Sequence, residues 1–75
     1  MNTQHAVSAL GALAQEHRLA VFRMLVKAGQ KGMAAGEIAA ELGVPSSSLS
    51  FHLAHLNRAG LVTQRRESRS LIYTA

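Results

Sequence analysis

Hydroxyl and basic side chains gather in the second half of the chain, where their types and spacing suit contacts with a polyanion. Segment 46–58, SSSLSFHLAHLNR, carries serines, histidines and an arginine, and Arg65, Arg66 and Arg69 follow it. Proteins contact phosphate oxygens and base edges largely through such hydroxyl and guanidinium groups. The chemistry that these residues offer is therefore hydrogen bonding and charge pairing.

The charge distribution agrees with a polyanionic partner. The net charge is +4. Residues 1–45 hold four Lys or Arg against three Glu, and residues 46–75 hold four Arg against one Glu, which gives +1 and +3 for the two parts. A solvated surface produces the same asymmetry, so charge alone leaves that alternative open.

Side chains for catalysis or metal coordination are scarce. The chain has no cysteine and its only acids are four glutamates, so thiol chemistry is removed and no serine–histidine–acid motif can be recognised. His52 and His55 have i, i+3 spacing, but two imidazoles without a carboxylate or thiol make a weak metal site. We expect no enzymatic activity, and no metal site or cofactor in this chain.

Hydrophobic periodicity predicts helices that position these groups. Apolar residues recur at helical spacing over 5–14 and again over about 15–28, where the pattern stops at Ala28-Gly29. After a glycine-containing loop, a third helix is expected over 35–42, with Gly43 in a left-handed cap.

A fourth helix and a hairpin complete the predicted fold. The helix runs from about Ser46 to Ala59, with the serines at 46–48 capping its first turn after Pro45. Segments 61–66 and 69–74 are richer in β-branched and aromatic residues and flank Glu67-Ser68. The fold class is therefore mainly α with a small β-hairpin, and residues 1–75 form a single domain.

The segment Glu37–Leu56 has the pattern of a helix-turn-helix. Ala39 is small where the two helices cross, and Gly43 follows four residues later in the turn. The apolar positions that let both helices share one core are filled by Ile38, Leu42, Val44, Leu49, Leu53 and Leu56. With the hairpin behind it, this segment predicts a winged helix-turn-helix of four helices followed by a two-stranded wing.

The opposite side of the fourth helix is the expected recognition surface. It presents Ser47, Ser50, Phe51, Ala54, His55 and Arg58. The candidate DNA-contacting residues of the whole helix are Ser46, Ser47, Ser48, Ser50, Phe51, His52, His55 and Arg58. Ser47 and Ser50 suit bases or phosphates, and Phe51 suits a thymine methyl group. Phe51 in the core or in a dimer interface is the alternative, and His52 is also expected to pack at the junction with the wing. Arg65, Arg66 and Arg69 surround the hairpin tip, where they suit phosphates or a minor groove.

The run from Leu10 to Tyr73 resembles the ArsR/SmtB family of bacterial winged-helix repressors. The resemblance is carried by LGALAQEHRLAVFRML, EIAAELGVPSSSLSFHLAHL, the following AGLV and the hairpin RRESRSLIYTA. It implies a homodimer that binds an imperfect palindromic operator and releases DNA when a metal or metalloid binds. It also implies that the serine-rich helix recognises DNA and that the three hairpin arginines form the wing.

Departures from the family pattern concern the inducer. The cysteine pair of many arsenic sensors is absent from EIAAELG, and the chain ends before the C-terminal helix that carries zinc ligands in other members. The SLSFHL segment is similar to the corresponding segment of arsenic-responsive repressors whose cysteines lie in a C-terminal tail. We therefore expect a metal or metalloid inducer only in a longer form, and the chain as a fragment that lacks a C-terminal dimerisation or sensor segment.

The expected partners are duplex DNA and a second copy of the chain. Ala6, Leu10 and Leu13 form a stripe that one small core does not fully bury, so they are predicted to make the dimer interface. No apolar run reaches the length of a bilayer span, so no membrane partner and a cytoplasmic location are expected. The alternative function is a winged-helix protein-interaction module that does not bind DNA.

Overall fold

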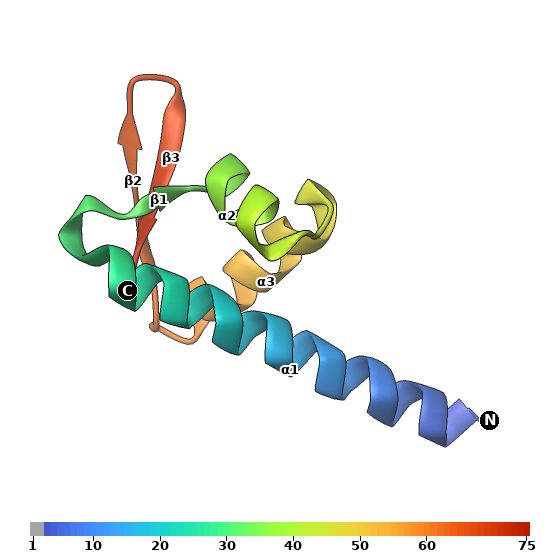
Figure 1. Cartoon of the computed structure of the whole chain (residues 1–75). Coiled ribbons are helices and arrows are strands. Elements are labelled where there is room, and N and C mark those ends of the chain that lie inside the picture. Colours follow the sequence, from blue (N-terminus) through green and yellow to red (C-terminus); the bar gives the residue numbers. More distant parts are fainter. Residues whose placement is uncertain (1–2) are drawn as a thin grey trace.

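Three α-helices and three short strands form residues 3–75, the part of the chain that the computed structural model describes (Figure 1). In chain order they are α1 Thr3–Ala28, the 3-10 helix η1 Gly29–Lys31, β1 Met33–Ala34, α2 Ala35–Leu42, α3 Ser46–Arg58, β2 Thr63–Glu67 and β3 Ser70–Thr74. Helices α2 and α3 form the helix-turn-helix, and the β2–β3 hairpin forms the wing. The predicted winged architecture is present with three helices instead of four.

Helix α1 is continuous over 26 residues, so the prediction of separate helices over 5–14 and 15–28 is wrong. No glycine or proline lies between Ala12 and Ala28, so nothing in the sequence interrupts the helix there. The change in apolar pattern marks a change of surroundings along one helix. Leu10 is 67% exposed on the N-terminal half, whereas Val21 and Leu25 on the C-terminal half are fully buried.

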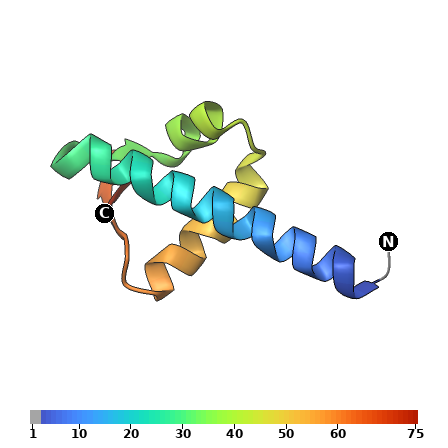
Figure 2. The ribbon, with the colours of Figure 1, turned by 60° about the horizontal axis from the view of Figure 1, so that its bottom comes forward.

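The core lies where the C-terminal half of α1 crosses α2 and α3, and the N-terminal half extends beyond the rest of the molecule (Figure 2). It is a single cluster to which all three helices and the segment before β2 contribute. Its buried apolar side chains are Val21, Leu25, Ile38, Leu49, Leu53, Leu56 and Val62. Burial of these side chains determines how α3 packs against α1.

The turn of the helix-turn-helix follows the sequence prediction at Gly43 but not at the serines. Gly43 adopts a left-handed conformation with φ +76°, and its N–H donates to the carbonyl of Ala39 over 2.9 Å. Pro45 occupies the N-cap of α3 in an extended conformation, and no side chain caps this end. The serines at 46–48 therefore lie inside the first turn, because proline's fixed φ suits the cap position ahead of them.

The wing belongs to a three-stranded antiparallel sheet with the order β1-β3-β2, which corrects the two-stranded prediction. In β1, Met33 pairs with Tyr73 and Ala34 pairs with Ile72. A two-residue strand is too short to show alternation in sequence. In the hairpin Glu67 pairs with Ser70, so the turn is Ser68-Arg69, one residue later than predicted.

Gly32 is expected to be essential for the join between α1 and the sheet. Its φ is +69°, and a Cβ there would lie 2.5 Å from the carbonyl oxygen of Tyr73. Gly32→Ala should therefore lower the free energy of unfolding by about 2 kcal/mol or more, measured by urea denaturation. The control Gly36→Ala, whose Cβ would have nothing within 4 Å, should be neutral or stabilising by up to about 1 kcal/mol. Equal effects of the two substitutions would contradict the close approach.

Candidate nucleic-acid interface

Helix α3 has one buried and one exposed side, as its sequence predicts. The side chains of Leu49, Leu53 and Leu56 are at most 5% exposed. The opposite side presents Ser46, Ser47, Ser48, Ser50, Phe51, Ala54 and Arg58 to solvent. Because serine and alanine are small, the backbone of the first turns can approach a flat or grooved surface closely. Ser50 donates its hydroxyl to the carbonyl of Ser46 over 3.0 Å, which still leaves its oxygen free to accept.

His52 does not belong to this exposed side, which corrects its assignment as a DNA-contacting residue. It is 6% exposed, and its ring meets that of His17 on α1 edge-on, with 5.4 Å between the ring centroids. Its packing partner is therefore α1 and not the wing. Position 52 lies three residues after Leu49 and four before Leu56, which places it on the buried stripe of the helix.

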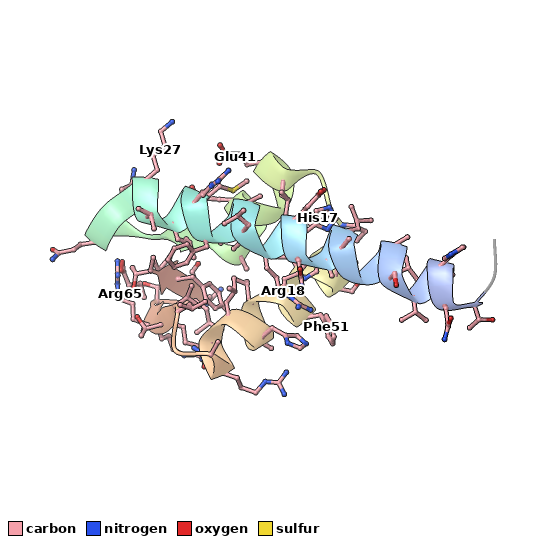
Figure 3. The ribbon with its side chains drawn as sticks, turned by 90° about the horizontal axis from the view of Figure 1, so that it is seen from below. His17, Arg18, Lys27, Glu41, Phe51 and Arg65 are labelled. Atoms are coloured by element: carbon pink, nitrogen blue, oxygen red, sulfur yellow. The ribbon has the colours of Figure 1, made fainter. Side chains whose placement is uncertain are left out.

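Phe51 lies on the surface between α3 and α1. It is 58% exposed, so the alternative that it turns into the core is wrong, whereas its place in a dimer interface stays a prediction. Its ring centroid lies 4.6 Å from that of His55 and 5.8 Å from the guanidinium carbon of Arg18 on α1. Figure 3 shows Arg18 and Phe51 beside each other under α1. This cation–π contact orients an aromatic ring that solvent would otherwise leave mobile.

The two histidines of α3 titrate at lower pH than a free imidazole. Burial lowers the pKa of His52, and the positive charge of Arg18 lowers it further. Desolvation and the nearby charges of Arg18 and Arg58 lower the pKa of His55. Within residues 3–75, the His52 Nδ1 and Arg18 Nε atoms are buried without a hydrogen-bond partner. A proton on His52 would thus be added to a buried site that already faces a cation.

The three wing arginines lie in different places. Arg69 is in the hairpin turn, and Arg66 pairs with Leu71 close to it. Arg65 points away from the tip, because its guanidinium donates to the carbonyls of Gln30 and Lys31 beyond the end of α1. The prediction that all three surround the tip is therefore wrong for Arg65.

A groove between α3 and the wing contains residues that the sequence reasoning missed. Its volume is about 360 Å³, and it is lined by Ser50, Leu53, Ala54, Asn57, Arg58, Gln64 and Tyr73. Alternate side chains of a strand face the same way, so Arg66 lies on the same face of β2 as Gln64. The alternation of Gln64 and Arg66 along the strand was visible in the sequence. Which side of the strand faces α3 could be assigned only from the way the strands pair.

The predicted dimer residues lie on the projecting half of α1. Leu10 is 67% exposed and Leu13 is 49% exposed, whereas Ala6 is partly buried. Val7, at 65% exposure, widens this apolar surface. An exposed apolar surface of this kind is suited to pack against another chain.

The described residues do not fit a metal site or a membrane span. Within residues 3–75, no group of three or more His, Cys, Asp or Glu side chains comes together. Nor is any helix in this part of the chain long and apolar enough to cross a bilayer.

Comparison with known proteins decides the family. A family described as a helix-turn-helix domain matches residues 13–65. The transcriptional activator HlyU of Vibrio cholerae is 40% identical over 97% of this chain and 65% of its own length. The putative arsenical resistance operon repressor ArsR of Halobacterium salinarum is 38% identical over 84% of this chain and 48% of its own length. The chain belongs to the ArsR/SmtB family.

A solved structure supports the same assignment. HlyU from Vibrio vulnificus, a transcriptional regulator, matches with a TM-score of 0.72 and 42% identity, covering 97% of this chain and 73% of that one. Identity at this level over almost the whole chain shows shared ancestry as well as a shared fold. This ArsR/SmtB chain spans 65% of the length of the Vibrio cholerae relative.

Acidification is expected to destabilise the fold through His52. Because its folded-state pKa is lowered, the stability that depends on neutral His52 is complete above the unfolded value of about 6.5 and is lost as the pH falls through the folded value. The free energy of unfolding in urea should therefore decrease below about pH 6.5, by at most about 1.4 kcal/mol per pH unit for one proton.

Two variants separate His52 from the other titrating groups. His52→Gln should remove most of the pH dependence in this window, since the amide stays neutral. His55→Gln, at the other histidine of α3 whose pKa is lowered, should keep most of the wild-type dependence, because His55 is closer to solvent than His52. If His52→Gln keeps it as well, burial of a neutral imidazole is not its origin.

Proposed function

We propose that this chain binds duplex DNA as a homodimer and acts as a transcriptional repressor on a palindromic operator. The observation that carries the proposal is the outward-facing side of α3. It presents small hydroxyl side chains at its N-terminal end and Arg58 near its other end, in a helix-turn-helix backed by a wing. A recognition helix that enters the major groove carries small polar side chains of this kind in its first turns. No enzymatic role is proposed.

The start of α3 suits base edges and phosphates for two reasons. Ser46, Ser47 and Ser48 are exposed and carry hydroxyls that both donate and accept hydrogen bonds. Because Pro45 at the N-cap makes no side-chain hydrogen bond to α3, the first N–H groups of α3 are available to donate to a phosphate oxygen. Phe51 adds an apolar contact that suits a thymine methyl group.

The wing supplies charge beside α3. Arg66 lies on the face of β2 that borders the groove with α3, and Arg69 lies in the turn. We assign both to phosphate contacts on DNA that flanks the recognition helix. Arg58, at the last turn of α3, lines the same groove and extends the positive surface.

The projecting half of α1 supports dimerisation. Leu10 and Leu13 are exposed on a helix that extends away from the other elements (Figure 1), and burying them would remove apolar surface from water. A symmetric dimer would place its two copies of α3 about 34 to 36 Å apart, in successive major grooves.

The relatives divide on the sign of regulation. The Vibrio cholerae protein is named an activator, and the Halobacterium salinarum protein is named a putative repressor. We propose repression, since a dimer on an operator excludes other proteins from the same DNA. We propose release by a metal or metalloid only for a longer form with its own ligands, and a cytoplasmic location where the chain meets DNA.

Exposure of Phe51 favours the second candidate, a protein-interaction module. An aromatic side chain that is 58% exposed is typical of an anchor in a protein interface. The serines and arginines around Phe51 are better suited to contact phosphates than to enter an apolar pocket of a partner protein. DNA binding is therefore the first function to test.

Selection from a pool of random duplexes tests both DNA binding and symmetry. The wild-type chain should retain a two-fold symmetric motif with half-sites about 10 base pairs apart, centre to centre. Leu10→Glu places a charge in the proposed interface and should retain single half-sites more weakly. Val26→Glu alters another exposed position of α1 and should keep the symmetric motif. A folded chain that retains no duplex at low salt would contradict DNA binding and favour the protein-interaction module.

A further inference from the structure

Arg65 makes more hydrogen bonds than any other side chain for which contacts are described in residues 3–75. Its Nε donates to Oε2 of Glu67 over 2.7 Å, Nη1 donates to the carbonyl of Gln30 over 3.1 Å, and Nη2 donates to the carbonyl of Lys31 over 3.0 Å. An arginine has five N–H donors in a planar fork, so three of them are already used within the chain.

The two carbonyls belong to η1, residues 29–31, the 3-10 turn that follows α1. Gly29, with φ +68°, turns the chain out of α1. Carbonyls at the end of a helical turn lack partners within the turn, so a cation that donates to them is stabilising. Arg65 supplies this cation from β2, 34 residues further along the chain. Figure 3 shows its side chain beside the C-terminal end of α1.

The acceptors are held in place by the sheet. Gly32 follows η1, is buried and lies against Tyr73 of β3, and Met33 pairs with the same residue. The loop therefore presents its carbonyls at a fixed position relative to β3. The exposed Arg65–Glu67 ion pair alone would contribute little to the stability of the fold. The two added hydrogen bonds to carbonyls fix the plane of the guanidinium group.

Neighbouring arginines of β2 face opposite ways. Alternation places Arg65 with Thr63 and Glu67 on one face of the hairpin and Arg66 with Gln64 on the other. The face with Gln64 borders α3, whereas the face with Arg65 meets the end of α1. The two adjacent guanidinium groups are thus directed to different tasks.

We propose that Arg65 is a positioning residue that fixes the angle of the wing by clamping β2 to the carbonyls of η1 behind α1, while Arg66 contacts DNA. The inference rests on the proposed DNA binding. Without the clamp, the hairpin is still tied to α1 through β1, through β3 and through Val62 in the core, but β2 loses its hydrogen bonds to η1. A more mobile wing would have to be ordered when DNA binds, which weakens binding while every phosphate contact is kept.

Salt dependence of operator binding separates the two arginines. Arg65→Ala should weaken operator binding on the order of tenfold, while the slope of log K for binding against log salt concentration stays that of the wild type. Binding is measured at a temperature where circular dichroism shows the variant folded. Arg66→Ala should reduce the slope by about 0.9 for each phosphate that the protein no longer neutralises. An Arg65→Ala variant with wild-type affinity, or with a slope reduced like that of Arg66→Ala, would overturn the proposal.

Arg65→Lys tests the clamp without removing the charge. Lysine still pairs with a phosphate as a point charge, but one ammonium cannot reproduce a planar fork that spans two carbonyls and a carboxylate. The clamp predicts weaker binding with an unchanged slope, and a direct phosphate contact predicts wild-type binding. If Arg65→Ala does not fold, the binding of Arg65→Lys tests the proposal in its place.

Hydrogen exchange of the DNA-free protein keeps this inference distinct from the proposed function. Arg65→Ala and Arg65→Lys should speed exchange of amides in β2, whereas Arg66→Ala should not. If the wild-type chain binds no DNA but this pattern is found, the proposed function fails and the clamp stands. If exchange in β2 is unchanged, the clamp itself is wrong.

Discussion

The packing of the C-terminal half of α1 across α2 and α3 is the contact on which the rest of the structure depends. Val21 and Leu25 are fully buried, and they form one cluster with Ile38, Leu49 and Leu53. A chain of this size can bury only a limited share of its apolar surface, so this cluster has to orient both helices of the helix-turn-helix. Because the leucines of α3 are fixed inward, its serines and Phe51 are turned outward.

Helix α1 also determines how the other parts of the interface are arranged. Midway along, Arg18 meets the ring of Phe51 and His17 meets the ring of His52. At its C-terminal end, the helix leads into the carbonyls that hold Arg65. Its projecting N-terminal half presents the exposed side chains of Leu10 and Leu13. The exposed side of α3, the wing and this apolar surface are thus all positioned relative to one helix. In the proposed dimer, that helix would set the separation between the two copies of α3.

Local patterns in the sequence were sufficient for the helix-turn-helix, whereas contacts between distant residues were not accessible. Gly43 and the leucine spacing of α3 are set within a few residues, so they were predicted correctly. His52 was named as a DNA-contacting residue from the family resemblance, although its position in the leucine stripe places it inside. Strand β1 and the direction of Arg65 depend on pairing with β3 and on residues some 34 positions away, and a continuous α1 was hidden by a change in burial along its length.

The most direct test of DNA recognition by α3 is a titration of the isotopically labelled protein with a selected operator duplex, followed by backbone amide chemical shifts. We expect the largest changes at the N-terminal half of α3 and in the β2–β3 turn, with smaller changes in α2 on the far side of the core. Changes confined to the N-terminal half of α1, with α3 and the hairpin unaffected, would contradict recognition of DNA by α3.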